Sequence, residues 1–156
     1  MKFTHRIFAV TTSVLFFVPI LSSCSGVGSG LAFGSDPNFV DAVSEAASSG
    51  EPFVLPRDGA PVASWGEVAV VCPYAVVDVD TPPVVARALE QIDTTMTDAS
   101  QWLVFVSGSS AETLTLTRDD IDLCATGLTP NTLFPVDAQW TGQLVDGVWQ
   151  VEPLVP

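Results

Sequence analysis

Residues Trp102–Thr117 read WLVFVSGSSAETLTLT and contain the clearest strand pattern in the 156-residue chain. The opening run, WLVFV, is β-branched and aromatic, which is typical of a buried strand. The closing run, ETLTLT, alternates strictly and places Leu114 and Leu116 on one face. Ser107–Ser110 lie between the two runs and consist of typical turn residues. We therefore predict an antiparallel hairpin with a connection of four to five residues.

Further strands are predicted on both sides of this hairpin. Gln139–Val145 and Val148–Leu154 are joined at Asp146-Gly147, which is a strong signal for a tight hairpin turn. Upstream, Glu67–Tyr74 (EVAVVCPY) is a short apolar run rich in valine and closed by Pro73. It is typical of a buried strand.

One helix is predicted between the first strand and the first hairpin. Thr81 followed by two prolines is a helix start, and the apolar positions after it recur at helical spacing. These positions, which form one stripe, are Val85, Ala88, Leu89 and Ile92. Strands with a segregated helix predict an α+β body over 65–156, namely a small antiparallel sheet of about five strands with one covering helix.

Residues 36–64 precede this body. Asp36-Pro37 offers an N-cap and a first-turn proline, and Phe39, Val43 and Ala46 recur at helical spacing, so a short helix is predicted over 37–48. Residues 51–64 contain several prolines and are predicted to be irregular. Two interpretations of this segment remain open. It is a passive connector, or it lies across the body or a partner through Phe53, Val54 and Leu55.

Residues 1–23 have the layout of a secretory signal peptide. Lys2 and Arg6 precede a largely apolar run, Ile7–Ile20, and small residues follow it. Fourteen helical residues would span only about 21 Å, whereas the hydrocarbon core of a bilayer is about 30 Å thick. The segment is therefore expected to be removed rather than kept as a membrane span.

Leu21-Ser22-Ser23-Cys24 resembles the lipobox of bacterial lipoproteins. The resemblance implies that Cys24 becomes the first residue of the mature chain and carries acyl chains, such as palmitate, on its thiol. It also implies an anchor at the extracytoplasmic face of the bacterial cell membrane. Residues 24–35, rich in Gly and Ser, would then form a flexible tether. The competing interpretation is an ordinary secreted protein in which Cys24 is a free thiol.

The two other cysteines, Cys72 and Cys124, are predicted to form a disulfide. They lie in separate apolar segments of an exported chain, where thiols oxidise. Neither belongs to a Cys-x-x-Cys motif, and no Lys or His is available to activate a thiolate. Lipidation of Cys24 would account for the cysteine left over.

Removal of residues 1–23 would also remove the only Lys and the only His. Three arginines (Arg57, Arg87 and Arg118) and 18 acidic residues remain, which gives a net charge of −15. This composition excludes a His base, a Schiff-base lysine and a Ser-His-Asp triad, and it argues against binding nucleic acid. No enzyme activity and no cofactor are expected, and the charge favours a basic partner.

Asp119, Asp120 and Asp122 form the densest group of acids. We predict a helical turn capped by Thr117 and ended at Gly127, with the acids at its positive end. The alternative is a cation site completed by Asp78 and Asp80, since calcium prefers several oxygen ligands. The spacing does not match the twelve-residue EF-hand loop.

The tryptophans and one further residue pattern bear on the function of the body, although neither identifies an activity. The four tryptophans, Trp65, Trp102, Trp140 and Trp149, are predicted to fill the core, although they could stack on sugars or peptides. Trp65, Pro73, Tyr74, Leu89 and Phe105 form a pattern that is similar to small secreted bacterial proteins of unassigned activity, which implies a β-α-β order and no reaction.

The sequence therefore predicts a lipid-anchored cell-envelope protein that binds a basic envelope protein or serves a structural role. One alternative is a carrier of a small hydrophobic ligand, which would need a pocket. Another is a hydrolase of envelope glycans that uses a pair of carboxylates.

Overall fold

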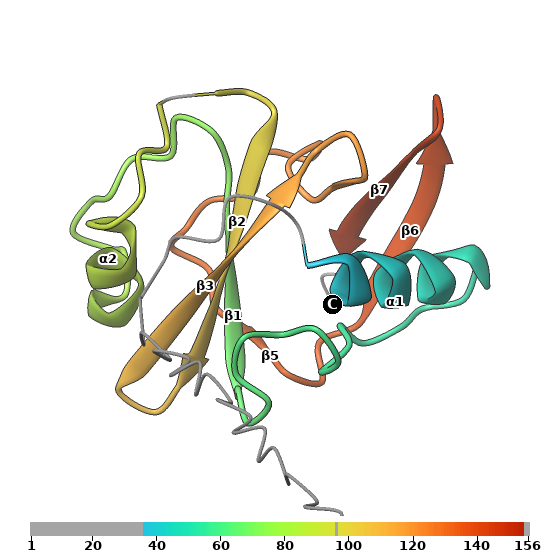
Figure 1. Ribbon diagram of the computed structural model, residues 1–156. Helices are drawn as coiled ribbons and strands as arrows, with labels where there is room; N and C mark the ends of the chain where they lie inside the picture. Colours follow the sequence, from blue (N-terminus) through green and yellow to red (C-terminus); the bar gives the residue numbers. More distant parts are fainter. Residues whose placement is uncertain (1–35, 96, 155–156) are drawn as a thin grey trace, which may run out of the picture. The chain divides into compact units, whose positions relative to one another are not determined.

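The computed structural model describes residues 36–95 and 97–154 (Figure 1). The predicted signal peptide, the predicted tether and Cys24 lie outside the described residues. The elements, in chain order, are α1 (Pro37–Ser48), β1 (Glu67–Val71), α2 (Pro83–Leu89), β2 (Ser100–Ser107), β3 (Ser110–Thr117), β4 (Ile121–Asp122), β5 (Phe134–Pro135), β6 (Trp140–Val145) and β7 (Val148–Pro153).

The strands form two sheets rather than the single sheet of about five strands that was predicted. One sheet has the order β3-β2-β1-β5 and the other has the order β4-β7-β6. All pairings are antiparallel except that of β4 with β7. The α+β class is confirmed. Strands β4 and β5 were not predicted because they have two residues each, too few to show a periodic pattern.

The hairpin β2-β3 is longer, and its turn tighter, than predicted. Ser107 pairs with Ser110, so the connection is the two residues Gly108 and Ser109 instead of four or five. Gly108 has a φ of 61° while Ser109 is not in the positive-φ region, as in a type II′ turn. The two flanking serines extend the ladder because pairing uses only their backbone groups.

The second hairpin is confirmed. β6 and β7 pair from Val145 and Val148 outward, and the intervening Asp146 and Gly147 have φ values of 51° and 90°. Positive φ at both central positions defines the type I′ turn that an Asp-Gly pair favours.

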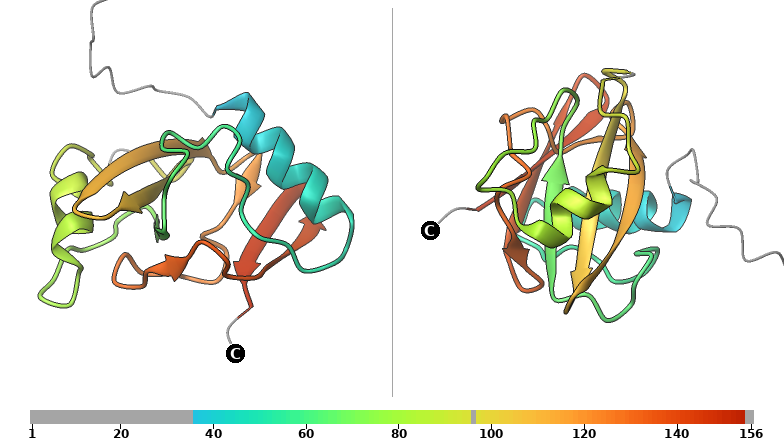
Figure 2. Two further views of the ribbon diagram at one scale, coloured as in Figure 1. Left: turned by 90° about the horizontal axis from the view of Figure 1, so that it is seen from below. Right: turned by 90° about the vertical axis from the view of Figure 1, so that its left-hand side faces the viewer.

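The four-stranded sheet is covered on both faces, and Figure 2 shows the two helices on opposite sides of it. Alternate side chains of β1 lie on opposite faces of the sheet, because successive side chains of a strand point in opposite directions. Val68 and Val70 belong to a core shared with α1 and the second sheet, whereas Ala69 and Val71 pack in a smaller cluster with Val85 of α2. The predicted stripe of α2 thus packs on the sheet.

Helix α1 begins and ends as predicted. The Asp36 carboxylate accepts a hydrogen bond from the Asn38 N–H at 2.9 Å, as an N-cap does. Phe39 and Val43 are buried, and the third buried position is Ala47 rather than the predicted Ala46. These side chains contribute to the main core, so the packed body starts at α1 rather than at Trp65.

The segment 51–64 lies across this body. Phe53 exchanges two backbone hydrogen bonds with Trp140, at 2.9 and 2.7 Å, and Leu55 is buried in the main core. A Cβ atom at Gly59 would lie 2.4 Å from the Phe39 backbone nitrogen, so the segment touches α1 backbone to backbone. Of the two interpretations left open, the segment lying on the body is the one observed.

The interpretation of the tryptophans as core residues is confirmed. Trp65, Trp102 and Trp140 are at most 6% exposed, and Trp149 packs against the main core from a half-buried position. Trp65 meets Phe105 edge to face at 5.2 Å between ring centroids. None of the three buried rings is available to stack on a ligand.

Candidate functional site

The disulfide predicted between Cys72 and Cys124 is present and joins the two sheets. Cys72 follows β1 of the four-stranded sheet, and Cys124 lies two residues beyond β4 of the three-stranded sheet. The bond closes a loop across 52 positions of sequence. It lies beneath a groove in the described part of the chain.

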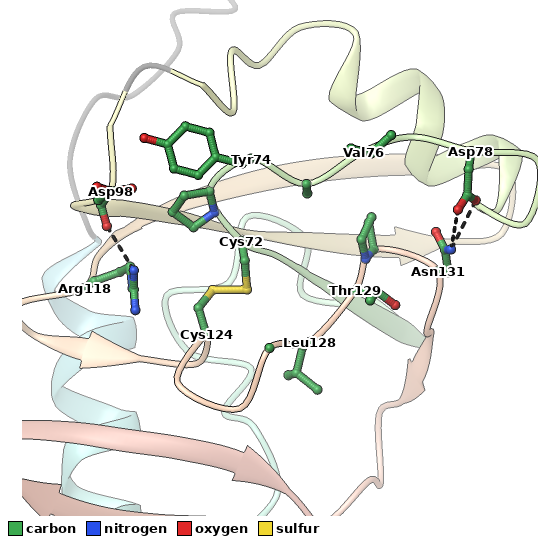
Figure 3. A pocket seen from close by; sticks show the side chains of 14 residues that line it. Cys72, Tyr74, Val76, Asp78, Asp98, Arg118, Cys124, Leu128, Thr129 and Asn131 are labelled. Atoms are coloured by element: carbon green, nitrogen blue, oxygen red, sulfur yellow. Dashed lines mark hydrogen bonds between the residues drawn. A yellow bond between two sulfur atoms is a disulfide. The ribbon is translucent and has the colours of Figure 1, made fainter.

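This groove has a volume of about 520 Å³ and is open to solvent (Figure 3). Residues 73–76 and Asp78 line one side, and residues 127–131 line the other. Asp98 and Arg118 lie at one end, and Asp78 and Asn131 lie at the other. The groove therefore combines an apolar middle with acidic groups at both ends.

The Asp78 end is held by a compact hydrogen-bond network. Asn131 donates to both carboxylate oxygens of Asp78 at 3.1 and 3.2 Å. The Thr81 hydroxyl lies 2.7 Å from the Asn131 side-chain oxygen and donates to it. The bonds from Asn131, followed by the Asp80 N–H, lower the pKa of Asp78, so this carboxylate stays negative.

At the other end, the only arginine of the groove is already neutralised. Arg118 donates to both oxygens of Asp122, at 3.1 and 2.8 Å, and to the Asp98 backbone oxygen at 3.2 Å. The hydrogen bonds to Asp122 raise the pKa of Arg118. A bidentate ion pair of this kind leaves little positive charge for a ligand.

The predicted helical turn at this place is wrong. Residues 118–120 form a turn in which the Asp120 N–H donates to the Thr117 oxygen, and β4 follows immediately as a strand parallel to β7. The physical reason is burial, because Ile121 and Leu123 are at most 1% exposed. The alternation of buried and polar side chains in Ile-Asp-Leu is the pattern of a strand and not of a helix. Gly127 ends no helix.

The five acids of the alternative cation site are not brought together. Asp122 is bound to Arg118 and to the Cys124 N–H, while Asp78 is bound to Asn131. Asp80, Asp119 and Asp120 are exposed. Within residues 36–95 and 97–154, no group of three or more His, Cys, Asp or Glu side chains is placed to hold a metal ion.

Two features of the site were not predicted from the sequence. The first is Gln101, a fully buried polar residue of β2. Its amide donates to the Ile121 oxygen, and its carbonyl oxygen accepts from the Leu123 N–H at 2.9 Å. Gln101 thus satisfies the backbone of β4 and fixes the second sheet against the first. Only its place in an otherwise apolar strand pattern could have indicated a special role.

The second is an exposed apolar rim, formed by Tyr74 and Val76, which line the groove, and by Val77 and Val79, which follow them in the chain without lining it. Their side chains are 58%, 74%, 47% and 99% exposed, respectively. Tyr74 also has a φ of 60°, a rare conformation for a large side chain. A hydrogen bond with Asp98 raises the pKa of the Tyr74 phenol, so it stays protonated. The stretch YAVVDVD carried the signal for this rim, as valines alternating with acids outside any strand.

Comparison of the chain with protein-family models, curated proteins and solved structures gives no match. Neither helix in the described range has the length and the apolar run that a membrane crossing would need.

Proposed function

We propose that this chain is a lipid-anchored, non-enzymatic binding module of the bacterial cell envelope. Its groove takes a basic, partly apolar segment of another envelope protein. The observation that carries the proposal is the exposed valine rim of a groove with acidic ends. Isolated exposed apolar residues are common, but a contiguous set beside a hollow marks a binding surface.

The apolar part of the partner is argued from Val76 and Val79. These side chains are among the most exposed large apolar groups of the described residues, and both stand in one short loop. If a partner buried one of these side chains completely, the contact would contribute about 1.5–3 kcal/mol to the free energy of binding. The loop is held at Asp78 by Asn131 and Thr81, so the rim is presented by a fixed backbone.

The basic part is argued from charge. Residues 36–154 hold all 18 acids against three arginines, and the only arginine of the groove is bound to Asp122. Asp78, Asp80 and Asp98 lie at or beside the groove ends. Such a surface attracts cationic segments over distances of the order of the Debye length, about 8 Å at physiological salt.

The envelope location rests on the resemblance of Leu21–Cys24 to a lipobox, and the disulfide is compatible with it. Acyl chains on Cys24 would anchor the chain at the outer face of the cytoplasmic membrane, with residues 25–35 as a tether. The non-enzymatic role rests on the absence of His and Lys from residues 24–156.

The binding claim is tested with a short synthetic peptide of alternating lysine and valine. We expect calorimetry to show binding that weakens as salt is raised, because the attraction is partly between charges. Val76→Ser should weaken binding about tenfold, as expected when one apolar contact is lost.

Leu144→Ser is the matched control, since Leu144 is 55% exposed on β6 and does not line the groove. It should bind the peptide like the unaltered protein. The groove would not be the site if the Val76→Ser protein bound the peptide as tightly as the unaltered protein does. The same conclusion would follow if a glutamate-valine peptide bound as tightly as the lysine-valine peptide.

A further inference from the structure

The four-stranded sheet has an eight-residue edge to which no further strand of the described residues is paired. β3 is the outer strand of the four-stranded sheet and has eight residues (Figure 2). The opposite edge, β5, has only two residues, one of which is Pro135. In the second sheet, the β6 edge is paired at Trp140 by Phe53.

The backbone groups on the β3 edge are identified by the pairing register. Ser107 and Ser110 flank the two-residue turn and form a hydrogen-bonded pair, and the Arg118 N–H donates to the Ala99 oxygen at 2.8 Å. The backbone N–H and C=O groups of the even-numbered residues of β3 therefore bond to β2. Those of the odd-numbered residues point away from β2. Within residues 36–95 and 97–154, the backbones of Ala111, Thr113 and Thr115 show no hydrogen-bond partner.

Natural proteins usually protect such an edge. They place a proline or a lysine on it, shorten it, or interrupt it with a bulge. The register of β3 with β2 is continuous from Ser100 to Thr117, and the strand contains neither Pro nor Lys. The edge is thus a template for pairing with another extended chain.

We propose that the β3 edge is a second binding surface, distinct from the groove, which adds an extended basic segment of another protein as a further strand. The side chains of Thr113 and Thr115 are half-buried and present little bulk at the edge. Three outward residues allow three pairs of main-chain hydrogen bonds over the length of the strand.

The charge of the occupant follows from the acids around the strand. Glu112 lies within β3, and Asp119 and Asp120 are exposed just beyond its end. A lysine-containing segment would be attracted most strongly at the Thr117 end, because at the turn end Arg87 donates to the Ser109 oxygen at 3.4 Å and offsets the charge of Glu112. A second copy of the chain would instead bring a body of net charge −15 against another of the same charge, which disfavours pairing of two β3 edges.

The test uses the lysine-valine peptide and hydrogen exchange of the intact protein, followed residue by residue. On binding, the amides of Ala111, Thr113 and Thr115 should exchange at least about tenfold more slowly, because each gains a partner. Those of Glu112, Leu114 and Leu116 are already bonded to β2 and should change less.

Thr113→Pro removes one outward N–H and leaves the β2 ladder intact, since proline is tolerated where its position faces away from the neighbouring strand. In the Thr113→Pro protein the peptide should no longer slow the exchange of the Ala111 and Thr115 amides, whereas in Thr113→Ala, which keeps the N–H, it should slow their exchange as in the unaltered protein. Unchanged exchange at the three amides, or no peptide binding at all, would overturn the proposal.

Other outcomes separate this surface from the groove and from self-association. Loss of binding in Val76→Ser with unchanged exchange along β3 would support the groove and contradict the edge. The reverse pattern would support the edge and contradict the groove. Sedimentation that shows a dimer, together with its dissociation in Thr113→Pro, would identify a second copy of the chain as the occupant. This result would overturn the proposal that the occupant is a basic segment of another protein.

Discussion

Replacement of Cys72 and Cys124 by serine is expected to lower the free energy of unfolding by about 4 kcal/mol. The bond closes a loop across 52 positions and so restricts the unfolded chain, by about this amount in the loop-entropy description. A small domain has only about 5–15 kcal/mol of total stability, so a large part of it would be lost.

Urea unfolding of the double variant measures this loss. Ala125→Ser is the matched control, because it places a serine beside Cys124 at an exposed position and leaves the bond intact, so it should leave the urea midpoint unchanged. The comparison also bears on the groove, since the disulfide lies beneath it. If the double variant unfolded at the same urea concentration as the control, the bridge would not be formed in the protein.

Phe39→Ala is expected to lower the free energy of unfolding by about 3–5 kcal/mol, the usual cost of removing a phenylalanine from a packed core. Phe39 is fully buried and meets Phe105 of β2 edge to face at 5.8 Å between ring centroids. The loss should affect the whole body in a single transition, because α1 and the sheets share one core.

Asp41→Ala on the same helix is the control for Phe39→Ala. Asp41 is exposed, and a surface substitution of this kind usually changes stability by less than about 0.5 kcal/mol. An unfolding midpoint in Phe39→Ala that matched Asp41→Ala would mean that α1 is an appendage and that the body begins downstream of it.

The elements that the sequence predicted well are those specified by neighbouring residues. The Asp146-Gly147 turn needs positive φ at two adjacent positions, and α1 needs an N-cap and a stripe of apolar side chains. In each case, the residues that determine the structure lie within one element or one turn. The same reasoning predicted β2 and β3, although their turn proved shorter.

What the sequence did not show depends on residues far apart in the chain. β4 is a strand because Gln101 and β7 satisfy its backbone, and no pattern of two residues could indicate this. The helical turn predicted there failed because the burial of Ile121 outweighed the capping signals around it.

The groove was unpredictable for the same reason. Its two sides, 73–76 with Asp78 and 127–131, are joined by the disulfide and by the bonds between Asp78 and Asn131, which are separated by 53 positions. The disulfide alone could be inferred beforehand, because the chain offered only one plausible pair of cysteines. The β3 edge could not be identified before the order of the strands was known.

Export and acylation at Cys24 are the central proposal, since they would define where the acidic body acts and what it can meet. The intact mass of the protein purified from its native membrane tests this directly. The expected mass is that of a chain that starts at Cys24, carries a diacylglyceryl group and lacks the two hydrogens lost to the disulfide. A mass that corresponds to a chain starting at Met1, or to a chain without lipid on Cys24, would contradict export and acylation at Cys24.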